Sequence, residues 1–196
     1  MAYKHWVLGV LLILVGCVSP EPQRAEVTTV VIQPSLEQIN LADKPFALVG
    51  RLVVNAKQQK FSGGIRWQHT QQNDEIYLFS SLGQVIAEIL RDQTGVSLTT
   101  SEPTTYHAQK AEYLTDQVLG WELPLAGLQF WVRGEHYPGT IAEKDLDTNN
   151  RTVAIRQDGW SVSYRSYHAA HQPKLLEFSY NDVKMKLIVD QWGKAE

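Results

Sequence analysis

Two long stretches near the C-terminus alternate between apolar and polar side chains, and this period of two constrains the fold more than any other feature. In WSVSYR, Val162 and Tyr164 are separated by serine, and in VKMKLIV, Met185 and Leu187 are separated by lysine. Successive side chains of a strand point to opposite faces, so each segment has one apolar and one wet face. This pattern predicts an antiparallel sheet that curves around an apolar interior.

The same signal, bounded by Asn, Gly or Pro, predicts seven more strands. They cover residues 46–54, 61–68, 75–80, 84–91, 95–100, 151–157 and 174–180. In the middle the period changes, because residues 111–119 repeat apolar side chains at helical spacing and stop at Gly120. A second helix is predicted over 124–134, with Pro124 in its first turn, and a short helix over 35–44. The sequence thus predicts at least eight strands around a central helical insertion.

The first sixteen residues have the pattern of a secretory signal peptide. Their apolar run, residues 7–16, is too short to span a bilayer, and it leads into LVGC, which resembles a bacterial lipobox. We therefore expect cleavage before Cys17 and lipidation of its sulfur; a cleaved soluble protein or an uncleaved anchor are the alternatives. Val18 follows the cysteine, which by resemblance to sorted bacterial lipoproteins suggests the outer membrane. Because Cys17 is the only cysteine, a disulfide within the chain is excluded.

The remaining chain is expected to hold one domain. Residues 17–34 contain three prolines and no sustained periodicity, so they are expected to form a lipidated N-terminus and flexible tether, with the domain over 35–196. The formal net charge of −3 and the scattered Lys and Arg residues do not indicate a nucleic-acid surface.

The chain lacks the common catalytic signatures. Neither a G-x-x-x-x-G-K-[ST] loop nor G-x-S-x-G nor H-E-x-x-H occurs, so we assign no catalytic residue and expect no metal and no cofactor. His168 and His171 could share a metal at helical spacing, but solvated histidines in a loop are the simpler interpretation. The carboxylates of residues 141–151 indicate a charged loop, and Asp158 with Gly159 a hairpin turn.

Taken in order, these segments resemble the LolB family, the outer-membrane receptors of the lipoprotein-localisation system. The resemblance rests on LVGC, FALVGRLVV, FSGGIRWQ, LFSSLGQVIAEIL, the helical LPLAGLQFWVRG, QDGWSVSYRSY and the closing strand with Trp192. It implies an incomplete, strongly curved antiparallel β-barrel with a helical lid over an apolar cavity. It also implies a protein that takes acylated lipoproteins from the periplasmic carrier LolA and inserts them into the inner leaflet of the outer membrane. Such a protein would be anchored at Cys17, face the periplasm and act without catalysis, and we expect a monomer.

The resemblance makes the apolar strand and helix faces candidates for the cavity and its lid. The cavity candidates are Leu48, Leu52, Ile65, Trp67, Leu78, Val162, Tyr164, Met185 and Leu187, and the lid candidates are Leu114, Val118, Leu128 and Trp131. Ordinary core packing is the alternative for each of them. A register error of one residue would exchange the two faces of any strand.

One turn, at Ser81, Leu82 and Gly83, carries an aliphatic side chain where turns are usually polar. The resemblance implies that Leu82 belongs to an exposed loop that acts on the membrane during delivery; the family commonly has proline where Ser81 stands. A leucine buried under a folded-back loop is the alternative. Burying one leucine contributes only about 1.5–3 kcal/mol, so the expected role is local disturbance of lipid or cargo release, and not anchoring.

A second class of function stays open, namely a non-catalytic envelope lipoprotein that binds a free lipid or scaffolds a partner complex. A connected apolar cavity under a removable helical lid would favour cargo transfer, and an interior packed with the protein's own side chains would favour the scaffold. An enzyme would require polar groups that converge inside the cavity.

Overall fold

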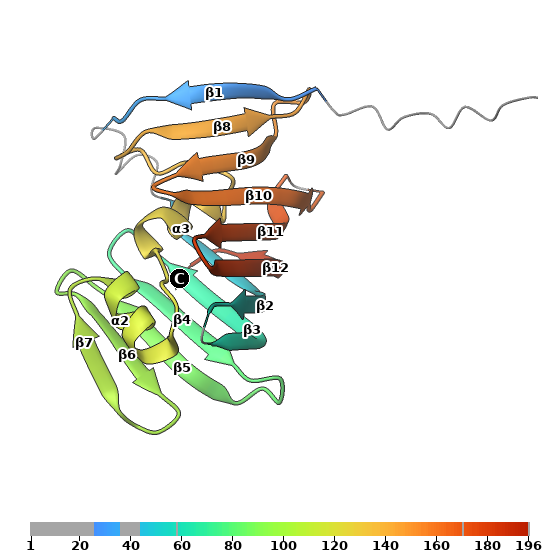
Figure 1. Cartoon of the computed structure of the whole chain (residues 1–196). Coiled ribbons are helices and arrows are strands. Elements are labelled where there is room, and N and C mark those ends of the chain that lie inside the picture. Colours follow the sequence, from blue (N-terminus) through green and yellow to red (C-terminus); the bar gives the residue numbers. More distant parts are fainter. Residues whose placement is uncertain (1–25, 36–43, 58, 170, 196) are drawn as a thin grey trace, which may run out of the picture.

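The computed structural model describes residues 26–35, 44–57, 59–169 and 171–195 (Figure 1). The signal peptide, Cys17 and most of the helix predicted over 35–44 lie outside these residues. Within the described residues, neither helix is long and apolar enough to cross a membrane.

Twelve strands in this described part form one antiparallel sheet. The strands are β1 (Thr28–Ile32), β2 (Phe46–Asn55), β3 (Lys60–His69), β4 (Asp74–Phe79), β5 (Val85–Arg91), β6 (Val96–Thr100), β7 (Thr105–Ala108), β8 (Ala142–Leu146), β9 (Thr152–Gln157), β10 (Trp160–Tyr167), β11 (Pro173–Tyr180) and β12 (Val183–Gly193). Their order across the sheet is β1-β8-β9-β10-β11-β12-β2-β3-β4-β5-β6-β7. The last strand, β12, thus pairs with β2 in the middle of the sheet, and β1 and β7 are left as free edges.

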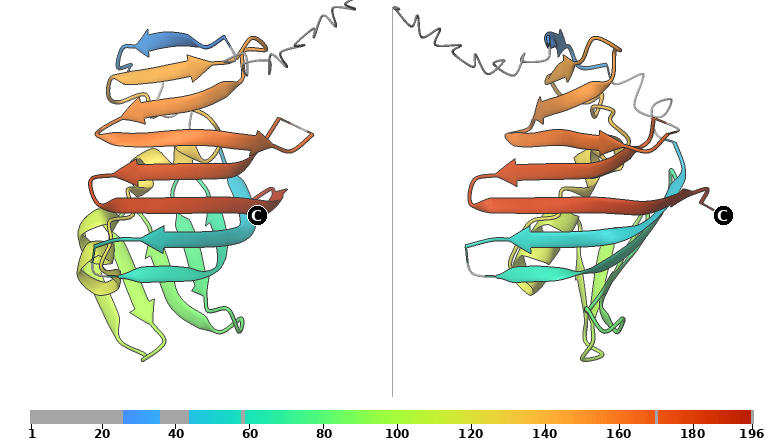
Figure 2. Two further views of the ribbon diagram at one scale, coloured as in Figure 1. Left: turned by 45° about the vertical axis from the view of Figure 1, so that its right-hand side comes forward. Right: turned by 90° about the vertical axis from the view of Figure 1, so that its right-hand side faces the viewer.

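The sheet bends strongly, so that its two ends face the same side (Figures 1 and 2). Helices α2 (Ala111–Leu119) and α3 (Leu125–Trp131) lie on this concave side and cover it. Because the edges do not pair, the architecture is an open, curved antiparallel sheet, which confirms the predicted incomplete barrel. We call α2, α3 and the segment between them the helical insertion.

Two glycines sit where strands come unusually close at the bend. A Cβ atom on Gly50 would overlap the backbone oxygen of Ile188, and one on Gly63 would overlap that of Phe79. Any other residue at either position would force the neighbouring strand away. Gly50 in VGRL and Gly63 in FSGG therefore allow the close approach of strands that the curved sheet requires.

The alternation predicted from sequence is present in the strands that line the interior. In β2, Phe46, Leu48, Leu52 and Val54 are buried, and the residues between them are more exposed. This is the burial pattern of a sheet with one face packed against a cover and one face in water. The cover is the helical insertion.

A buried polar cluster holds three neighbouring strands together beneath this core. The Trp67 indole donates to Oδ1 of Asp74 at 2.7 Å, and Nδ1 of His69 lies 2.7 Å from the same oxygen. The guanidinium of Arg91 in β5 forms an ion pair with Oδ2. The fully buried Asp74 carboxylate is thus surrounded by donors from β3 and β5, which is the condition for burying a charge without a large penalty.

Both helices of the insertion were predicted, α2 with the same bounds. Gly120 ends α2 with φ 82° and donates to the carbonyl of Asp116. Helix α3 is shorter than the predicted 124–134, because it ends at Trp131 and the chain then turns to Gly134, which has φ 79°.

Two predictions about irregular segments were wrong. Residues 28–32, expected to belong to the tether, form β1, and residues 142–146, expected to lie in a charged loop, form β8. The two strands pair with each other, and the Arg156 guanidinium in β9 binds Asp145 with two hydrogen bonds of 2.8 Å. Thr29 also donates to Asp145, so the charges that suggested a solvated loop form cross-strand bonds on the outer face. Strand β7, at the opposite edge, was not predicted either.

Candidate functional site

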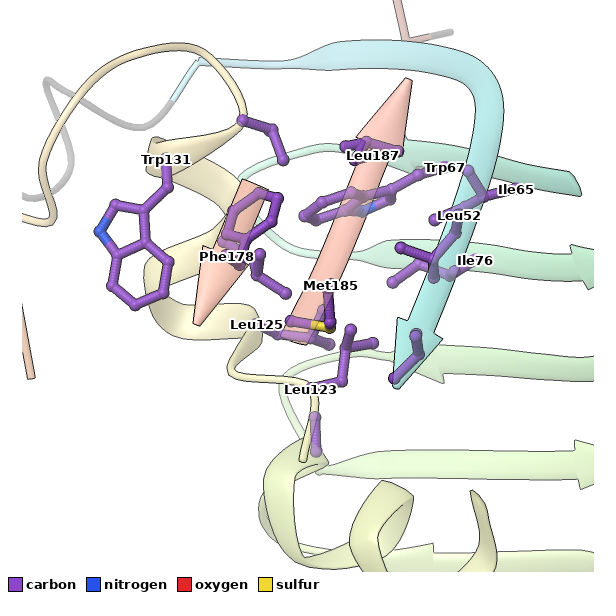
Figure 3. Close-up of a cluster of buried hydrophobic side chains, with 14 of the residues drawn as sticks. Leu52, Ile65, Trp67, Ile76, Leu123, Leu125, Trp131, Phe178, Met185 and Leu187 are labelled. Atoms are coloured by element: carbon purple, nitrogen blue, oxygen red, sulfur yellow. The ribbon is translucent and has the colours of Figure 1, made fainter. Parts of the chain in front are cut away.

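The interior between α3 and the middle of the sheet is lined only by apolar side chains. Two strands of the first half, β2 and β3, contribute side chains together with β4, β11 and β12, and the helical insertion closes the other side (Figure 3). The lining residues are Leu52, Ile65, Trp67, Ile76, Leu123, Leu125, Leu128, Val132, Phe178, Met185 and Leu187.

Six of the predicted cavity and lid residues lie in this lining. They are Leu52, Ile65, Trp67, Leu128, Met185 and Leu187. The other predicted residues are buried or partly buried elsewhere in the same core: Leu48, Leu78, Leu114, Val118, Trp131, Val162 and Tyr164. Every predicted strand residue therefore points inward. The sequence pattern did not show which of these residues lie against α3.

Five lining residues were not predicted. Ile76 and Phe178 follow the same alternation as the predicted residues of their strands, so their positions were accessible from the sequence. Leu125 and Val132 share the helical face of the predicted Leu128, so they too were accessible from the sequence, whereas Leu123 precedes α3 and only the tertiary fold brings it to the sheet.

The free space among these side chains has a volume of only about 20 Å³. A pocket for a drug-sized ligand encloses about 300–1,000 Å³, and a single water needs about 10–15 Å³. In this conformation the interior is therefore filled by the protein's own side chains. Leu125 and Leu128 of α3 occupy the space that a ligand would need. Figure 3 shows Leu125 beside Met185 of β12.

The C-terminal end of α3 is fixed to the sheet by hydrogen bonds. The indole of Trp131, which points away from the apolar lining in Figure 3, donates to Oε1 of Gln157 at 2.9 Å. The hydroxyl of Tyr164 donates to the Trp131 carbonyl at 2.7 Å. Gln157 also accepts from the backbone N–H of Tyr137 and donates to its carbonyl, so one amide holds both the helix and the loop after it.

Burial raises the pKa of the Tyr164 hydroxyl well above its usual value. The hydroxyl is therefore neutral near pH 7 and remains a hydrogen-bond donor to the α3 carbonyl. This tyrosine was predicted as a cavity residue, and in the structure its hydroxyl also binds the carbonyl of Trp131 at the end of α3.

The N-terminal part of the insertion meets the sheet through apolar contacts. Ala111 and Leu114 of α2 are buried in the core, and the ring of Trp121 stacks on Phe61 of β3 with centroids 5.9 Å apart. Thr115 bonds within the insertion, where its hydroxyl accepts from the N–H of Leu123 at 2.9 Å. The two ends of the insertion are thus held by different kinds of interaction.

A second feature lies on the rim of the sheet, in the connection between β4 and β5. In this connection, residues 80–84 (the Leu82 loop), the Ser80 hydroxyl accepts from the backbone N–H of Leu82 and of Gln84. Gly83 adopts φ 81° and donates to the Ser80 carbonyl. This tight turn leaves the Leu82 side chain 86 % exposed, so the alternative of a leucine buried under a folded-back loop does not describe this conformation.

The polar residues that the sequence analysis considered have structural roles in the described part of the chain. Among the described residues there is no group of three His, Cys, Asp or Glu side chains placed to hold a metal. His168 in the β10–β11 connection lies with Nε2 2.9 Å from the carbonyl oxygen of Val189, a structural contact. The turn at Asp158 and Gly159 has φ 52° and 80°, as the sequence predicted for this hairpin.

The comparison with known proteins agrees with this architecture. The sequence profile of the family described as "Outer membrane lipoprotein LolB" matches residues 44–192. An "Outer-membrane lipoprotein LolB" of Nitrosomonas europaea is 68% identical, with 98% of this chain and 93% of the relative covered. Another protein of that name, from Thiobacillus denitrificans, is 36% identical over 100% of this chain and 96% of the relative.

A solved structure shares the fold at low sequence identity. The crystal structure of a LolA superfamily protein from Nitrosomonas europaea superposes with a TM-score of 0.52, covering 82% of this chain and 90% of that one at 10% identity. This likeness concerns the fold, and the sequence matches over nearly the whole chain show that the protein belongs to the LolB family of outer-membrane lipoproteins.

Proposed function

We propose that this protein accepts acylated lipoproteins from the periplasmic carrier LolA and inserts them into the inner leaflet of the outer membrane. The observation that carries the proposal is the wholly apolar lining between α3 and the sheet, found in a member of the LolB family. Every side chain of this lining is apolar, which suits the binding of acyl chains. The proposal includes a lipid anchor at Cys17, a periplasmic domain and action as a monomer.

The chemistry of the cargo explains the need for such an interior. Each methylene removed from water contributes about 0.8 kcal/mol, so acyl chains cannot cross an aqueous space uncovered. With a free volume of about 20 Å³, the interior must open before a chain can enter. Displacing Leu125 and Leu128 exchanges one apolar contact for another, so the exchange costs little net burial. Direction then comes from the differential affinity of carrier, receptor and bilayer for the same chains.

The exposed Leu82 supplies the delivery step in this proposal. An aliphatic side chain that is 86 % exposed gains about 1.5–3 kcal/mol when it is buried, which is too little to anchor a protein but sufficient to bias a loop toward lipid. The hydrogen bonds of Ser80 and the positive φ of Gly83 shape the turn that presents it, and Ser81 precedes it in the loop.

One observation favours the second candidate function. The interior is packed in this conformation, as expected for an envelope lipoprotein that scaffolds a partner or binds a small free lipid. The two candidates differ in whether the insertion moves away from the sheet to admit acyl chains.

Transfer from a loaded carrier tests the main proposal. The intact protein, reconstituted in vesicles, is mixed with LolA that carries a fluorescently labelled lipoprotein, and the label is followed in both fractions. We expect loss of label from the carrier and its appearance in the vesicles. Label that stays on the carrier, under conditions in which a known LolB removes it, would exclude the transfer function and favour the scaffold.

Replacing Leu82 by Glu separates acceptance from delivery. The side chain makes few contacts, so the free energy of unfolding should change by less than about 0.5 kcal/mol. We expect cargo to leave the carrier at the wild-type rate and insertion into the vesicles to slow. Ile141→Glu is the matched control, because Ile141 is also an exposed aliphatic residue, at 57%, near the opposite edge of the sheet. Equal insertion rates for both variants would contradict the role of Leu82.

A further inference from the structure

A trough on the outer face of the sheet begins at the base of the Leu82 loop. It has a volume of about 560 Å³ and follows β2, β3 and the end of β4 on the face turned away from the helices. Gly64 and Phe79 lie in its floor, and the exposed guanidinium groups of Arg51 and Arg66 stand beside them. The trough therefore joins an apolar surface to two cations, next to Leu82, the most exposed aliphatic side chain in the described part of the chain.

Local geometry explains why an aromatic ring lies on this outer face. Gly64 pairs with Phe79 across β3 and β4, and a Cβ atom on Gly64 would stand 3.3 Å from the Phe79 Cβ. The absence of a side chain at Gly64 leaves room for the ring to lie over the strand. The Arg66 guanidinium lies 5.9 Å from the centre of the same ring, a cation–π distance that holds the charge above the trough.

The charge of Arg66 is not neutralised within the part of the chain that the structure describes, where it has no carboxylate partner. Arg51, by contrast, is 3.1 Å from Asp190. No acidic side chain lines the trough. On the opposite side from Asp190, Glu75 and Glu88 both accept from the hydroxyl of Tyr77, the residue that pairs with Arg66, and they bound the cationic surface there.

The position of Arg66 along the strand matches the depth of a lipid headgroup. Arg66 pairs with Tyr77, and three further residues lead along β4 to Ser80, where the loop to Leu82 begins. At about 3.3 Å per residue, Arg66 stands about 10 Å behind the start of the loop. The polar headgroup layer of a bilayer is about 5–7 Å thick on each side of the hydrocarbon core. With the strands along the bilayer normal and Ser80 at the inner edge of this layer, the Arg66 backbone stands just outside the layer, and its long side chain can reach back to the phosphates.

We propose that this trough docks a phospholipid of the acceptor bilayer, with the phosphate at Arg66 and the glycerol and upper acyl carbons on Phe79 and the neighbouring apolar floor. The contact fixes the depth and orientation at which the Leu82 loop enters the leaflet. This inference rests on the proposed delivery function, and it names the lipid contact through which delivery occurs. An anionic headgroup is favoured, because the phosphate meets an unneutralised guanidinium and no acidic lining.

Two measurements on the intact, anchored protein test the docking site. In the first, vesicles of phosphatidylethanolamine with and without phosphatidylglycerol receive cargo from the loaded carrier. We expect phosphatidylglycerol to speed insertion for the wild type, and Arg66→Glu to slow insertion into these vesicles by about fivefold or more, since one basic residue near an anionic surface has about this effect on binding. Arg66→Lys should retain most of the rate, and removal of cargo from the carrier should not change.

The second measurement uses no cargo. A phosphatidylglycerol that carries a photoactivatable group near its phosphate is included in the vesicles, and cross-linked peptides are identified by mass spectrometry. We expect cross-links to residues 60–69 and 74–84, reduced several-fold in Arg66→Glu. Lys174→Glu is the control, because Lys174 is exposed on β11 and lies outside the trough.

The outcomes separate the two proposals. Cross-links at the trough without any cargo transfer would support the lipid site and exclude the delivery function. Cargo transfer that is equally fast for Arg66→Glu, together with unchanged cross-linking, would overturn the docking site and leave the delivery function intact. A thermal unfolding midpoint equal to that of the wild type shows that each variant is folded.

Discussion

The two ends of the helical insertion face the same sheet but are held to it differently. At the end of α3, the Trp131 indole and carbonyl form hydrogen bonds with Gln157 and Tyr164. At α2, the contact consists of buried apolar side chains such as Leu114. Hydrogen bonds between buried groups fix one geometry and leave costly unpaired donors when they break, whereas apolar contacts can be exchanged for other apolar contacts.

Under the proposed function, this difference distinguishes the end of the insertion that would move from the end that would stay. An acyl chain would replace the aliphatic contacts of the α2 end and of the lining without leaving a polar group unpaired. It cannot replace the bonds at Gln157 and Tyr164. The comparison therefore places the fixed point of the insertion at the C-terminal end of α3, and the following predictions test it.

Replacement of Trp131 by Ala should have the largest effect. The side chain is 1% exposed, and removing a buried aromatic residue costs about 3–5 kcal/mol of unfolding free energy. Trp131→Phe keeps a ring and loses the hydrogen bond to Gln157, so it should cost clearly less. Urea unfolding of both variants measures the difference. A loss below about 1 kcal/mol for the alanine variant would show that the α3 end is not a fixed point.

Replacement of Gln157 by Ala should have an intermediate effect. It leaves the buried Trp131 indole without an acceptor, which costs about 1–3 kcal/mol, and it also removes the acceptor of the partly buried Tyr137 N–H, which can turn to water. Gln191→Ala, at an exposed glutamine of β12, is the matched control and should change stability by less than about 0.5 kcal/mol. Hydrogen exchange should show faster exchange at 125–137 in the first variant only; uniform acceleration would contradict a local anchor.

Replacement of Tyr164 by Phe should have the smallest effect near pH 7, about 0.5–1.5 kcal/mol for one hydrogen bond. Because burial raises the pKa of Tyr164, the folded state keeps its proton when the unfolded state has lost it. The stability that this group contributes is thus fully present below about pH 10 and is lost as the pH rises toward the folded-state pKa, by up to about 1.4 kcal/mol per pH unit.

The alkaline loss should be weaker in Tyr164→Phe than in the wild type. Burial also raises the pKa of Tyr167, to about 12, so part of the loss remains in the variant. Urea midpoints between pH 8 and the alkaline limit of the protein measure both effects. Identical pH profiles would show that the hydroxyl of Tyr164 is not the buried donor at α3.

Strands that bury one face could be predicted from sequence, and strands at the edges could not. In β2 and β12 each buried apolar residue alternates with an exposed one, and this pattern follows directly from the pleat. Strands β1 and β7 are mostly exposed, and β8 gains its order from Arg156, which is distant in sequence. Cross-strand pairing of this kind leaves no local period in the sequence.

Some residues of the candidate site could likewise be predicted from the sequence, and others could not. Leu82 was identified because an aliphatic residue at a glycine turn is unusual in itself, and its exposure agrees with that interpretation. The strand residues of the interior were predicted from alternation. By contrast, the anchoring role of Gln157 and the trough beside Arg66 depend on which strands become neighbours, and no pattern within one segment carries that information.

The unpaired edges of the sheet have a mechanical consequence. In a closed barrel the number of strands and their stagger set the radius, so the lumen cannot widen without breaking backbone hydrogen bonds. Here β1 and β7 are separate ends of one twelve-stranded sheet, and each strand between them is hydrogen-bonded to both of its neighbours. The curvature of the sheet can therefore decrease slightly while the hydrogen bonds between its strands stay in place. Under the proposed function, the elasticity of the whole sheet would set the volume available to cargo, and it would allow acyl chains of different number and length to fit.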